Sequence, residues 1–231
     1  MPDGTENRYL RWDACYNARD LGGLPTRDGA RTRWGALIRA DSVGRLTEQG
    51  RAALEAYGIR TIIDLRFGVE VRDDPSPFTD HATIIAHNLP LNPNDVAVTR
   101  SLATQRGSAL PYPATVNVAY LATHQSQIAA VMRAIAGAPE GGILFHCHAG
   151  RDRTGLIAAL LLAVADVPAA VITADYALSF SAVAETMDAT LAHLEDVYGG
   201  VEGYLRTADV TESEIARIRN RLRDDSPPPV P

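Results

Sequence analysis

The stretch that most constrains the fold is residues 141–164, which read GGILFHCHAGRDRTGLIAALLLAV. An apolar run of strand length comes first, a polar turn follows, and an apolar run long enough for a buried helix completes the stretch. A strand that passes through a short loop into a helix is the repeating unit of α/β proteins with a parallel sheet. The sequence therefore predicts a strand at 141–147 and a helix at 153–164.

Similar units recur along the chain. Short β-branched or apolar runs that end in charge predict strands, and helical periodicity bounded by capping residues predicts helices. The predicted strands are 36–41, 59–66, 82–91 and 141–147. The predicted helices run from Thr47 to a stop at Gly58, over 114–136, over 153–164, from Pro168 to about residue 197, and over 212–222 behind a Thr211–Glu214 capping box. We expect an α/β fold with a mostly parallel central sheet flanked by helices.

Length and composition narrow the class of protein. The chain has 231 residues, so we expect a single domain over residues 1–224 and a disordered tail at 225–231. The net charge of −6 disfavours nucleic acid as a partner. All 22 basic residues are arginine, which excludes mechanisms that need a phosphate-binding or Schiff-base lysine.

Three features bear on where the protein works. No run approaches the roughly 18 apolar residues of a membrane-spanning helix, so we expect no stable membrane insertion. The N-terminal residues are polar and lack the apolar segment of a secretory signal. Two cysteines, Cys15 and Cys147, are too few for a disulfide framework. We expect a cytoplasmic protein, or one secreted without a signal peptide; the oligomeric state is not predicted.

Polar clusters follow three of the predicted strands. They lie at Arg39–Asp41, at Asp64–Arg66 and at His146–Cys147. In open α/β sheets, ligands bind beyond the carboxyl ends of the parallel strands. We therefore expect a functional site at this edge of the sheet.

Residues 147–153, CHAGRDR, are called the cysteine loop below. A loop that enters a helix presents unpaired backbone N–H groups and a partial positive charge, and so favours an anion. Ala149 and Gly150 are small enough to let the backbone approach an oxyanion. Arg153, at the helix start, offers a planar fork for two phosphate oxygens. The loop is thus predicted to bind phosphate.

Cys147 lies at the base of this anion site. A cysteine at a helix N-terminus near basic groups can have its pKa lowered to roughly 3.5–7.5, which would make the sulfur a nucleophile toward a bound phosphoryl group. Thr154 is placed to hydrogen-bond the sulfur and His146 to fix the loop from behind. No metal and no cofactor is required.

The leaving oxygen needs a proton donor within hydrogen-bond reach. Asp152, inside the loop, is the first candidate, Asp64 the second and Asp95 the third. Neighbouring arginines count against Asp152 because they favour the carboxylate, unless bound phosphate dianion raises its pKa.

The segment HCHAGRDRTG resembles the H-C-x-x-G-x-x-R-[S/T] signature of protein tyrosine phosphatases, matching it at Cys147, Gly150, Arg153 and Thr154. The form H-C-x-A-G-x-D-R-T-G is similar to the atypical bacterial branch of tyrosine and lipid phosphatases, with dual or triple specificity. Further segments that resemble this branch are NARDLGG at 17–23, LIRADS at 37–42, IRTIIDLR at 59–66, ADYALS at 174–179 and GGVEGYLR at 199–206.

The resemblance implies that Cys147 is the nucleophile, Arg153 the phosphate binder and Asp152 the acid. It implies phosphorylated protein or phosphoinositide as the substrate, with phosphotyrosine first and phosphoserine or phosphothreonine as alternatives. Relatives often carry lysine where this chain has Arg151, which keeps the charge but changes its geometry and leaves phosphoinositide specificity open.

Several of these residues can also be interpreted without a direct role in catalysis or binding. His148 either contacts substrate or faces solvent, and Arg151 is expected at the rim of the site. Asp64 and Arg66 are equally well explained as an ion pair at a strand end.

Near the N-terminus, Asn17, Arg19 and Asp20 either support the cysteine loop through hydrogen bonds or belong to a separate turn. Cys15 is expected to be inert, the other possibility being a reversible disulfide with Cys147.

Two rival functions remain. One is a phosphate-binding pseudophosphatase without turnover, and the other is a thiol redox or sulfur-transfer enzyme, which lacks a C-x-x-C motif. The helices after residue 168 could cover the site as a lid, although Tyr176, Leu178 and Phe180 are expected in the core.

Overall fold

A computed structural model describes residues 8–91 and 112–224 of the chain. Its central sheet has five strands in the order β1-β3-β6-β4-β5. Strands β3, β6, β4 and β5 are parallel, and only β1 runs antiparallel to its neighbour β3. The prediction of a mostly parallel sheet in an α/β fold is confirmed. The strands are β1 (Arg19–Asp20), β3 (Leu37–Ala40), β4 (Ile59–Asp64), β5 (Ile85–Asn88) and β6 (Gly142–His146).

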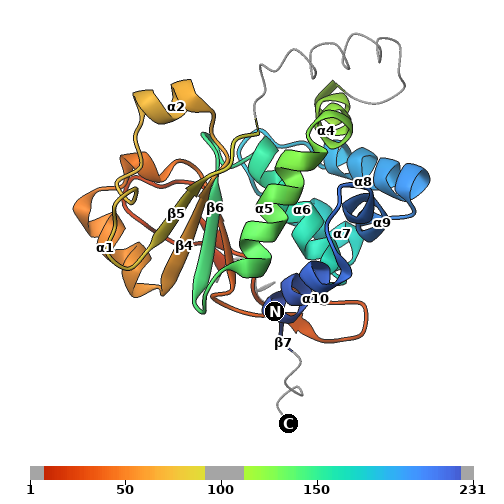
Figure 1. Cartoon of the computed structure of the whole chain (residues 1–231), viewed down its shortest axis with the longest axis horizontal. Coiled ribbons are helices and arrows are strands. Elements are labelled where there is room, and N and C mark those ends of the chain that lie inside the picture. Colours follow the sequence, from red (N-terminus) through yellow and green to blue (C-terminus); the bar gives the residue numbers. More distant parts are fainter. Residues whose placement is uncertain (1–7, 92–111, 225–231) are drawn as a thin grey trace.

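Helices cover both faces of the sheet. Figure 1 shows α1 on one side of the strands and the helices from α4 to α10 gathered on the other. A small antiparallel sheet pairs β2 (Arg31–Thr32) with β7 (Arg223–Asp224). The helices are α1 (Glu48–Ala56), α2 (Gly68–Asp73), α4 (Tyr112–Thr123), α5 (Gln125–Gly137), α6 (Asp152–Val164), α7 (Ala169–Ala177), α8 (Ala184–Tyr198), α9 (Val201–Thr207) and α10 (Glu212–Leu222), with a 3-10 turn at Val43–Arg45.

The two faces of the sheet belong to two hydrophobic clusters. Because side chains alternate along a strand, Ile143 and Phe145 join the larger cluster under the helices, whereas Leu144 between them joins the smaller cluster that includes Leu54 of α1. Helix α6 is buried nearly all round, which fits its continuous apolar sequence. The strand–loop–helix unit at 141–164 therefore lies at the centre of the molecule.

Several predicted elements differ in extent. The helix predicted over 114–136 is divided into α4 and α5 at His124, whose backbone leaves the helical region (φ −121°, ψ 31°). The Thr123 hydroxyl donates to the Ala119 carbonyl at 2.6 Å, a side-chain bond that competes with the helix ladder. The strand predicted over 82–91 is shorter, at Ile85–Asn88.

The helix predicted from Pro168 to about 197 is also two helices, α7 and α8. They are separated by a turn at 178–183, where Ser181 takes a positive φ of 58°. Helix α10 begins at its predicted capping box, in which Thr211 and Glu214 bond each other's backbone. Across the described ranges 8–91 and 112–224, no helix combines the length and apolar character required to cross a bilayer.

Candidate active site

The cysteine loop joins β6 to α6 and lies against the end of β3. Gly150 in the loop has a φ of +66°, and a Cβ added there would lie 2.4 Å from the backbone oxygen of Ala40. A side chain at this position would therefore meet both the left-handed backbone penalty and an immovable neighbour. This close approach explains why the loop carries glycine at position 150.

Three successive carbonyl groups of the loop accept hydrogen bonds from outside it. The His148 carbonyl accepts from the Ser42 amide at 3.1 Å, that of Ala149 from Asn17 Nδ2 at 3.0 Å, and that of Gly150 from Arg39 Nη2 at 2.9 Å. In a trans peptide the N–H points opposite to the C=O. The amides of residues 149–151 are consequently turned toward the inside of the loop, as an anion site requires.

One of these donors, Arg39, is held directly by a buried carboxylate, Asp175 of α7. Asp175 accepts from Arg39 at 2.8 Å, from Arg19 at 3.1 Å and from Arg8 at 2.8 Å, and all four side chains are at least 96% buried. Burial by itself would raise the pKa of Asp175, but the charges of the three arginines hold it far below its usual range. Three guanidinium groups on a single carboxylate leave a net positive charge under the loop.

This network reaches the loop by two routes. Arg39 contacts the Gly150 carbonyl directly, while Arg19 donates to Asn17 Oδ1 at 2.6 Å and Asn17 holds Ala149. Burial, followed by the like charge of Arg19, lowers the pKa of Arg39 to about 10, so it remains charged at neutral pH. Asn17 and Arg19 thus lie in contact with the loop and with its support.

Asp20 lies elsewhere. Its carboxylate accepts from the amides of Gly22 and Gly35 and from the Tyr57 hydroxyl. These contacts hold the turn that precedes β3. These contacts are those of a turn network, and none of them reaches the cysteine loop.

Arg153 of α6 is positioned by Glu70 of α2. The two terminal nitrogens of Arg153 donate to the two carboxylate oxygens of Glu70 at 2.6 and 2.7 Å. Glu70 also accepts from the Phe67 amide at 3.1 Å, which caps α2, and the Phe67 ring lies 5.8 Å from the guanidinium of Arg153. Although burial opposes it, the bond to Arg153 and its charge lower the pKa of Glu70.

Cys147 is 2% exposed at the base of the loop. Thr154, the residue after Arg153, is fully buried, and its hydroxyl has no hydrogen-bond partner among the described residues. Cys147, which begins the loop, and Thr154, which directly follows it, are thus both buried.

His146 ends β6 directly before Cys147. Burial lowers the pKa of its imidazole, which leaves the ring neutral and allows Nδ1 to donate to the Cys147 carbonyl at 3.2 Å. Its Nε2 lies 3.8 Å from Asp64. The histidine contacts the backbone behind the cysteine, as the sequence suggests.

Asp152 lies at the mouth of the site with its side chain 46% exposed. Arg151 Nε donates to both carboxylate oxygens at 3.1 Å, and the Tyr176 hydroxyl donates to one of them at 3.3 Å. Asp152 and Arg153 line a cavity of about 370 Å³, whose other walls are Val116, Asn117, Tyr120, Arg151, Tyr176, Ser181, Val183 and Thr186. A partly exposed carboxylate beside an empty volume is sterically able to meet a leaving oxygen.

Asp64 is held differently. Both of its oxygens accept from the buried Arg66, at distances from 2.7 to 3.1 Å, and Arg66 continues to Ser42 and Asp74. This geometry is that of an ion pair at a strand end. Asp95, the third candidate acid, lies outside the described residues.

Of the remaining rim residues, His148 is exposed and Arg151 is partly buried. His148 Nε2 lies 3.5 Å from Arg45, and Arg151 contacts the carbonyl of Phe180 at 3.4 Å. The expectation that Phe180 is a core residue is wrong, because it is 92% exposed in the turn between α7 and α8. Tyr176 is buried and Leu178 is partly buried, so the turn directs only Phe180 outward.

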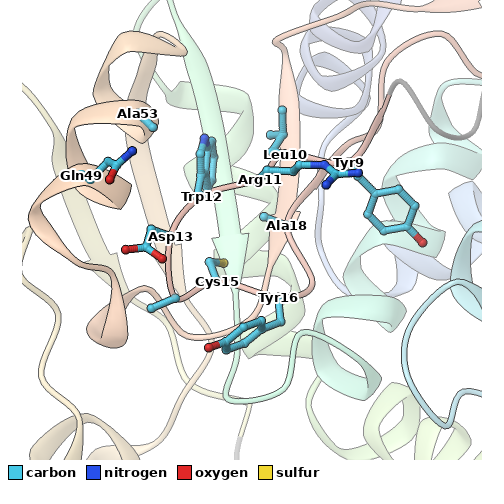
Figure 2. Close-up of a pocket in the computed structure, with 11 residues that line it drawn as sticks. Tyr9, Leu10, Arg11, Trp12, Asp13, Cys15, Tyr16, Ala18, Gln49 and Ala53 are labelled. Atoms are coloured by element: carbon cyan, nitrogen blue, oxygen red, sulfur yellow. The ribbon is translucent and has the colours of Figure 1, made fainter.

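Cys15 lies on the other side of β3 from the loop's interior. Its thiol donates to Asp41 Oδ1 at 2.8 Å. Burial, and then the charge of Asp41, raise the pKa of this thiol well above its usual range. Figure 2 shows Cys15 with Trp12, Ala18 and Tyr16 on the wall of a separate cavity of about 990 Å³. A protonated, bonded thiol of this kind fits the interpretation of Cys15 as inert.

Sequence reasoning missed Asp175 and Glu70. Asp175 is the single charge in the apolar helix AAVITADYA, and a buried acid is nearly always paired, so its partner could have been sought. Glu70 lies in a six-residue helix and carried no comparable signal. Within residues 8–91 and 112–224, no group of three or more His, Cys, Asp or Glu is arranged to hold a metal ion.

Comparison with known proteins gives concordant matches. The model of the "Tyrosine phosphatase family" matches residues 10–185 and 180–224. A "Tyrosine-protein phosphatase" of Nostoc commune is 32% identical, over 96% of this chain and 82% of the relative. The "Triple specificity protein phosphatase PtpB" of Mycobacterium tuberculosis is 27% identical, over 90% of this chain and 96% of the relative.

Among solved structures, the crystal structure of P. aeruginosa TpbA aligns with a TM-score of 0.40 and 16% identity, covering 75% of this chain and 86% of that chain.

Proposed function

The chain belongs to the tyrosine phosphatase family, and on that premise we propose that it hydrolyses phosphate monoesters through a phosphoryl intermediate on Cys147. The family is one of phosphoric monoester hydrolases. The observation that carries the proposal is the outward bonding of the carbonyls of His148, Ala149 and Gly150, which leaves inward-facing amides around Cys147.

In the proposed first step, the loop amides and Arg153 hold the equatorial oxygens of the substrate phosphoryl group. The Cys147 sulfur attacks phosphorus, the bond to the leaving oxygen breaks, and Asp152 gives that oxygen a proton. The buried positive charge of Arg39 and Arg19 favours both the thiolate and the phosphate dianion. Glu70 supports the step by holding Arg153 in one orientation.

In the second step, water attacks the cysteinyl phosphate and the sulfur leaves as thiolate. Asp152, now a carboxylate, accepts the proton of the attacking water. The buried Thr154 hydroxyl is free to hydrogen-bond the departing sulfur. Asp64 and Arg66 support the strand end and the ring of His146 from behind.

We propose phosphotyrosine as the first substrate class. The cavity of about 370 Å³ beside Asp152 and Arg153 has apolar and aromatic walls from Val116, Tyr120 and Tyr176, which suits an aryl group. Phosphoserine, phosphothreonine and phosphoinositides are further candidates, and the mycobacterial relative is named a triple specificity protein phosphatase. The exposed His148 and Arg151 at the rim would meet additional phosphates of a polyanionic head group.

We propose that residues 1–224 form one phosphatase domain, which acts in the cytoplasm or outside the cell. A panel of phosphopeptides, inositol phosphates, phosphoinositides and nucleotides, ranked by kcat/KM, would identify the substrate class. A preference for nucleotides would contradict the assignment to protein or lipid substrates.

The decisive experiment is hydrolysis of para-nitrophenyl phosphate by the wild-type protein, by Cys147→Ser and by Cys15→Ser. We expect turnover to fall to background in Cys147→Ser and to persist in Cys15→Ser, because only Cys147 lies in the loop. Orthovanadate should inhibit the wild type. Vanadate binding without turnover in the wild type would instead favour a phosphate-binding module.

A further inference from the structure

Tyr120 is a buried residue of the site cavity for which the sequence motif provides no role. It lies in α4, is 2% exposed, and lines the same cavity of about 370 Å³ as Asp152 and Arg153. Its ring also packs edge-on against His124, with centroids 5.2 Å apart. The side chain is therefore held in place at the wall of the site.

The hydroxyl of Tyr120 has no hydrogen-bond partner within the described chain. A buried hydroxyl that lacks a partner destabilises a folded protein, because it has given up water without replacement. Other buried tyrosines nearby do have partners: the hydroxyl of Tyr176 donates to Asp152, and that of Tyr204 donates to the Leu121 carbonyl at 3.0 Å. An unsatisfied hydroxyl in a native structure calls for a functional explanation.

The charges around Tyr120 are those of the cysteine loop. Burial raises the pKa of the Tyr120 hydroxyl, Arg153 opposes the increase, and Cys147, Glu70 and Asp152 add to it. The hydroxyl therefore stays protonated at neutral pH and is a donor. Its electrostatic neighbours include both the proposed nucleophile and the proposed phosphate-binding arginine.

We propose that the Tyr120 hydroxyl donates a hydrogen bond to the phosphoryl group bound between Cys147 and Arg153. The inference rests on the proposed function, since it names a further ligand of the same phosphoryl group. A phosphate oxygen is a strong, charged acceptor, and it would satisfy a donor that the protein leaves unpaired. The ring is already fixed in the cavity wall, and because the hydroxyl oxygen is closed to solvent, binding requires a small opening of that wall.

The contact assigns Tyr120 two effects. Its hydroxyl adds a neutral donor to a site otherwise built from backbone amides and a guanidinium, and its ring supplies part of the apolar wall beside the leaving group. Phenylalanine at this position would keep the wall and lose the donor. The substitution Tyr120→Phe therefore isolates the hydrogen bond.

The test compares Tyr120→Phe with wild type and with the control Tyr204→Phe. In Tyr120→Phe we expect kcat/KM for para-nitrophenyl phosphate to fall roughly 10- to 100-fold, the range for one hydrogen bond to a charged group, and the dissociation constant of orthovanadate to rise by a similar factor. The melting temperature of the ligand-free variant should equal or exceed that of the wild type, because an unpaired hydroxyl has been removed.

Tyr204→Phe should behave in the opposite way. It loses a formed hydrogen bond to the Leu121 carbonyl, and neither residue lines the cavity, so its melting temperature should fall while kcat/KM and vanadate affinity stay within twofold of the wild type. The pair of variants thus separates a ligand contact from a general effect of removing a buried tyrosine hydroxyl.

Two results would overturn the inference. One is a Tyr120→Phe protein whose kcat/KM and vanadate affinity lie within twofold of wild type. The other is a loss of activity that accompanies a lower melting temperature, which would make Tyr120 a structural residue. Calorimetric titration of orthovanadate into Cys147→Ser and into Cys147→Ser/Tyr120→Phe decides the contact even if the wild type shows no turnover, so failure of the proposed function remains distinguishable.

Discussion

Glu70 and Arg153 face each other as a two-pronged pair, with distances of 2.6 and 2.7 Å between their terminal nitrogen and oxygen atoms. The arginine belongs to the cysteine loop, whereas the glutamate comes from a short helix 83 residues earlier. The orientation of the guanidinium proposed to bind phosphate is thus set by a different part of the chain from the one that carries the motif.

Replacement of Glu70 by Gln should loosen Arg153 without altering the volume of the side chain. We expect kcat/KM for para-nitrophenyl phosphate to fall about 10-fold, mainly through KM, because a charge-assisted pair contributes roughly 1.5 kcal/mol or more to holding the guanidinium. Steady-state kinetics of Glu70→Gln measures the effect. A KM equal to that of the wild type would contradict a role for Glu70 in substrate binding.

The same pair predicts a pH dependence of stability. The pKa of Glu70 is lowered in the folded state. The ionised Glu70 therefore adds to the free energy of unfolding above its unfolded-state pKa of about 4.3, and this stabilisation is lost as the pH falls through the folded-state pKa. The difference in melting temperature between wild type and Glu70→Gln should therefore be present at pH 7 and shrink on acidification below about pH 4. Calorimetry at both pH values tests this.

Asp152→Asn should slow hydrolysis more for a poor leaving group than for a good one. Phenyl phosphate needs protonation of its leaving oxygen, and general acid catalysis contributes roughly 100- to 10,000-fold, whereas para-nitrophenolate leaves more readily unprotonated. Asp64→Asn is the matched comparison, since its carboxylate is bound by Arg66. Equal effects of Asp152→Asn on the two substrates would place the acid elsewhere.

Asp175→Asn should destabilise the protein strongly. Removal of the carboxylate leaves three buried arginines without a counter-charge, and breaking a buried ion pair costs about 3–5 kcal/mol. Asp166→Asn is the control, because the Arg27–Asp166 pair is exposed and such pairs contribute about 1 kcal/mol or less. Urea unfolding of both variants measures the difference. Similar losses in the free energy of unfolding for Asp175→Asn and Asp166→Asn would mean that Asp175 is not the centre of the network.

Gly150→Ala should impair turnover because the new methyl group would meet the Ala40 carbonyl at 2.4 Å and displace the loop. Gly29→Ala controls for backbone strain alone: its φ is +88° but its Cβ would have no atom within 4 Å. The free energy of unfolding of both variants should fall by about 1–2 kcal/mol, because alanine is disfavoured in the left-handed backbone region. Only Gly150→Ala should lose activity, and an active Gly150→Ala protein would contradict the described loop geometry.

Mild peroxide should oxidise Cys147 and leave Cys15 unmodified. The raised pKa of Cys15 keeps it a thiol at neutral and mildly alkaline pH, and oxidation follows thiolate character. Peptide mass spectrometry after peroxide treatment would reveal the modified residue. A linked peptide containing Cys15 and Cys147 would instead support the reversible disulfide.

The strands and the cysteine loop could be predicted because their signals are local. Runs such as ILFH and TIID are short, and the residues beside them indicate strands covered on both faces rather than helices, and the loop is recognisable from residue types within seven positions. The division at His124 lies in the backbone angles of that one residue, which periodicity does not detect. Two-residue strands such as β1 are too short to carry any pattern.

The supporting contacts of the site could not be predicted, since they join distant parts of the chain. The sequence alone does not distinguish Asn17 from Asp20 as a residue that hydrogen-bonds the cysteine loop. The fold shows that Asn17 reaches Ala149, whereas Asp20 accepts from Gly22. Likewise, the sequence indicates an acid in helix α7 without indicating that three arginines surround it. Phe180 was misplaced because a single turn decides whether its ring faces inward.

The ion pairs between Asp175 and the arginines behind the loop have a consequence during synthesis of the chain. The ribosome adds the whole HCHAGRDRTG segment before it adds residue 175, so a shorter nascent chain contains the proposed nucleophile without the carboxylate that holds the arginines behind the loop. Fragments that stop short of α7 will carry the complete signature and remain inert. Catalytic competence should therefore emerge late, only once the carboxyl-terminal third has been made and has docked.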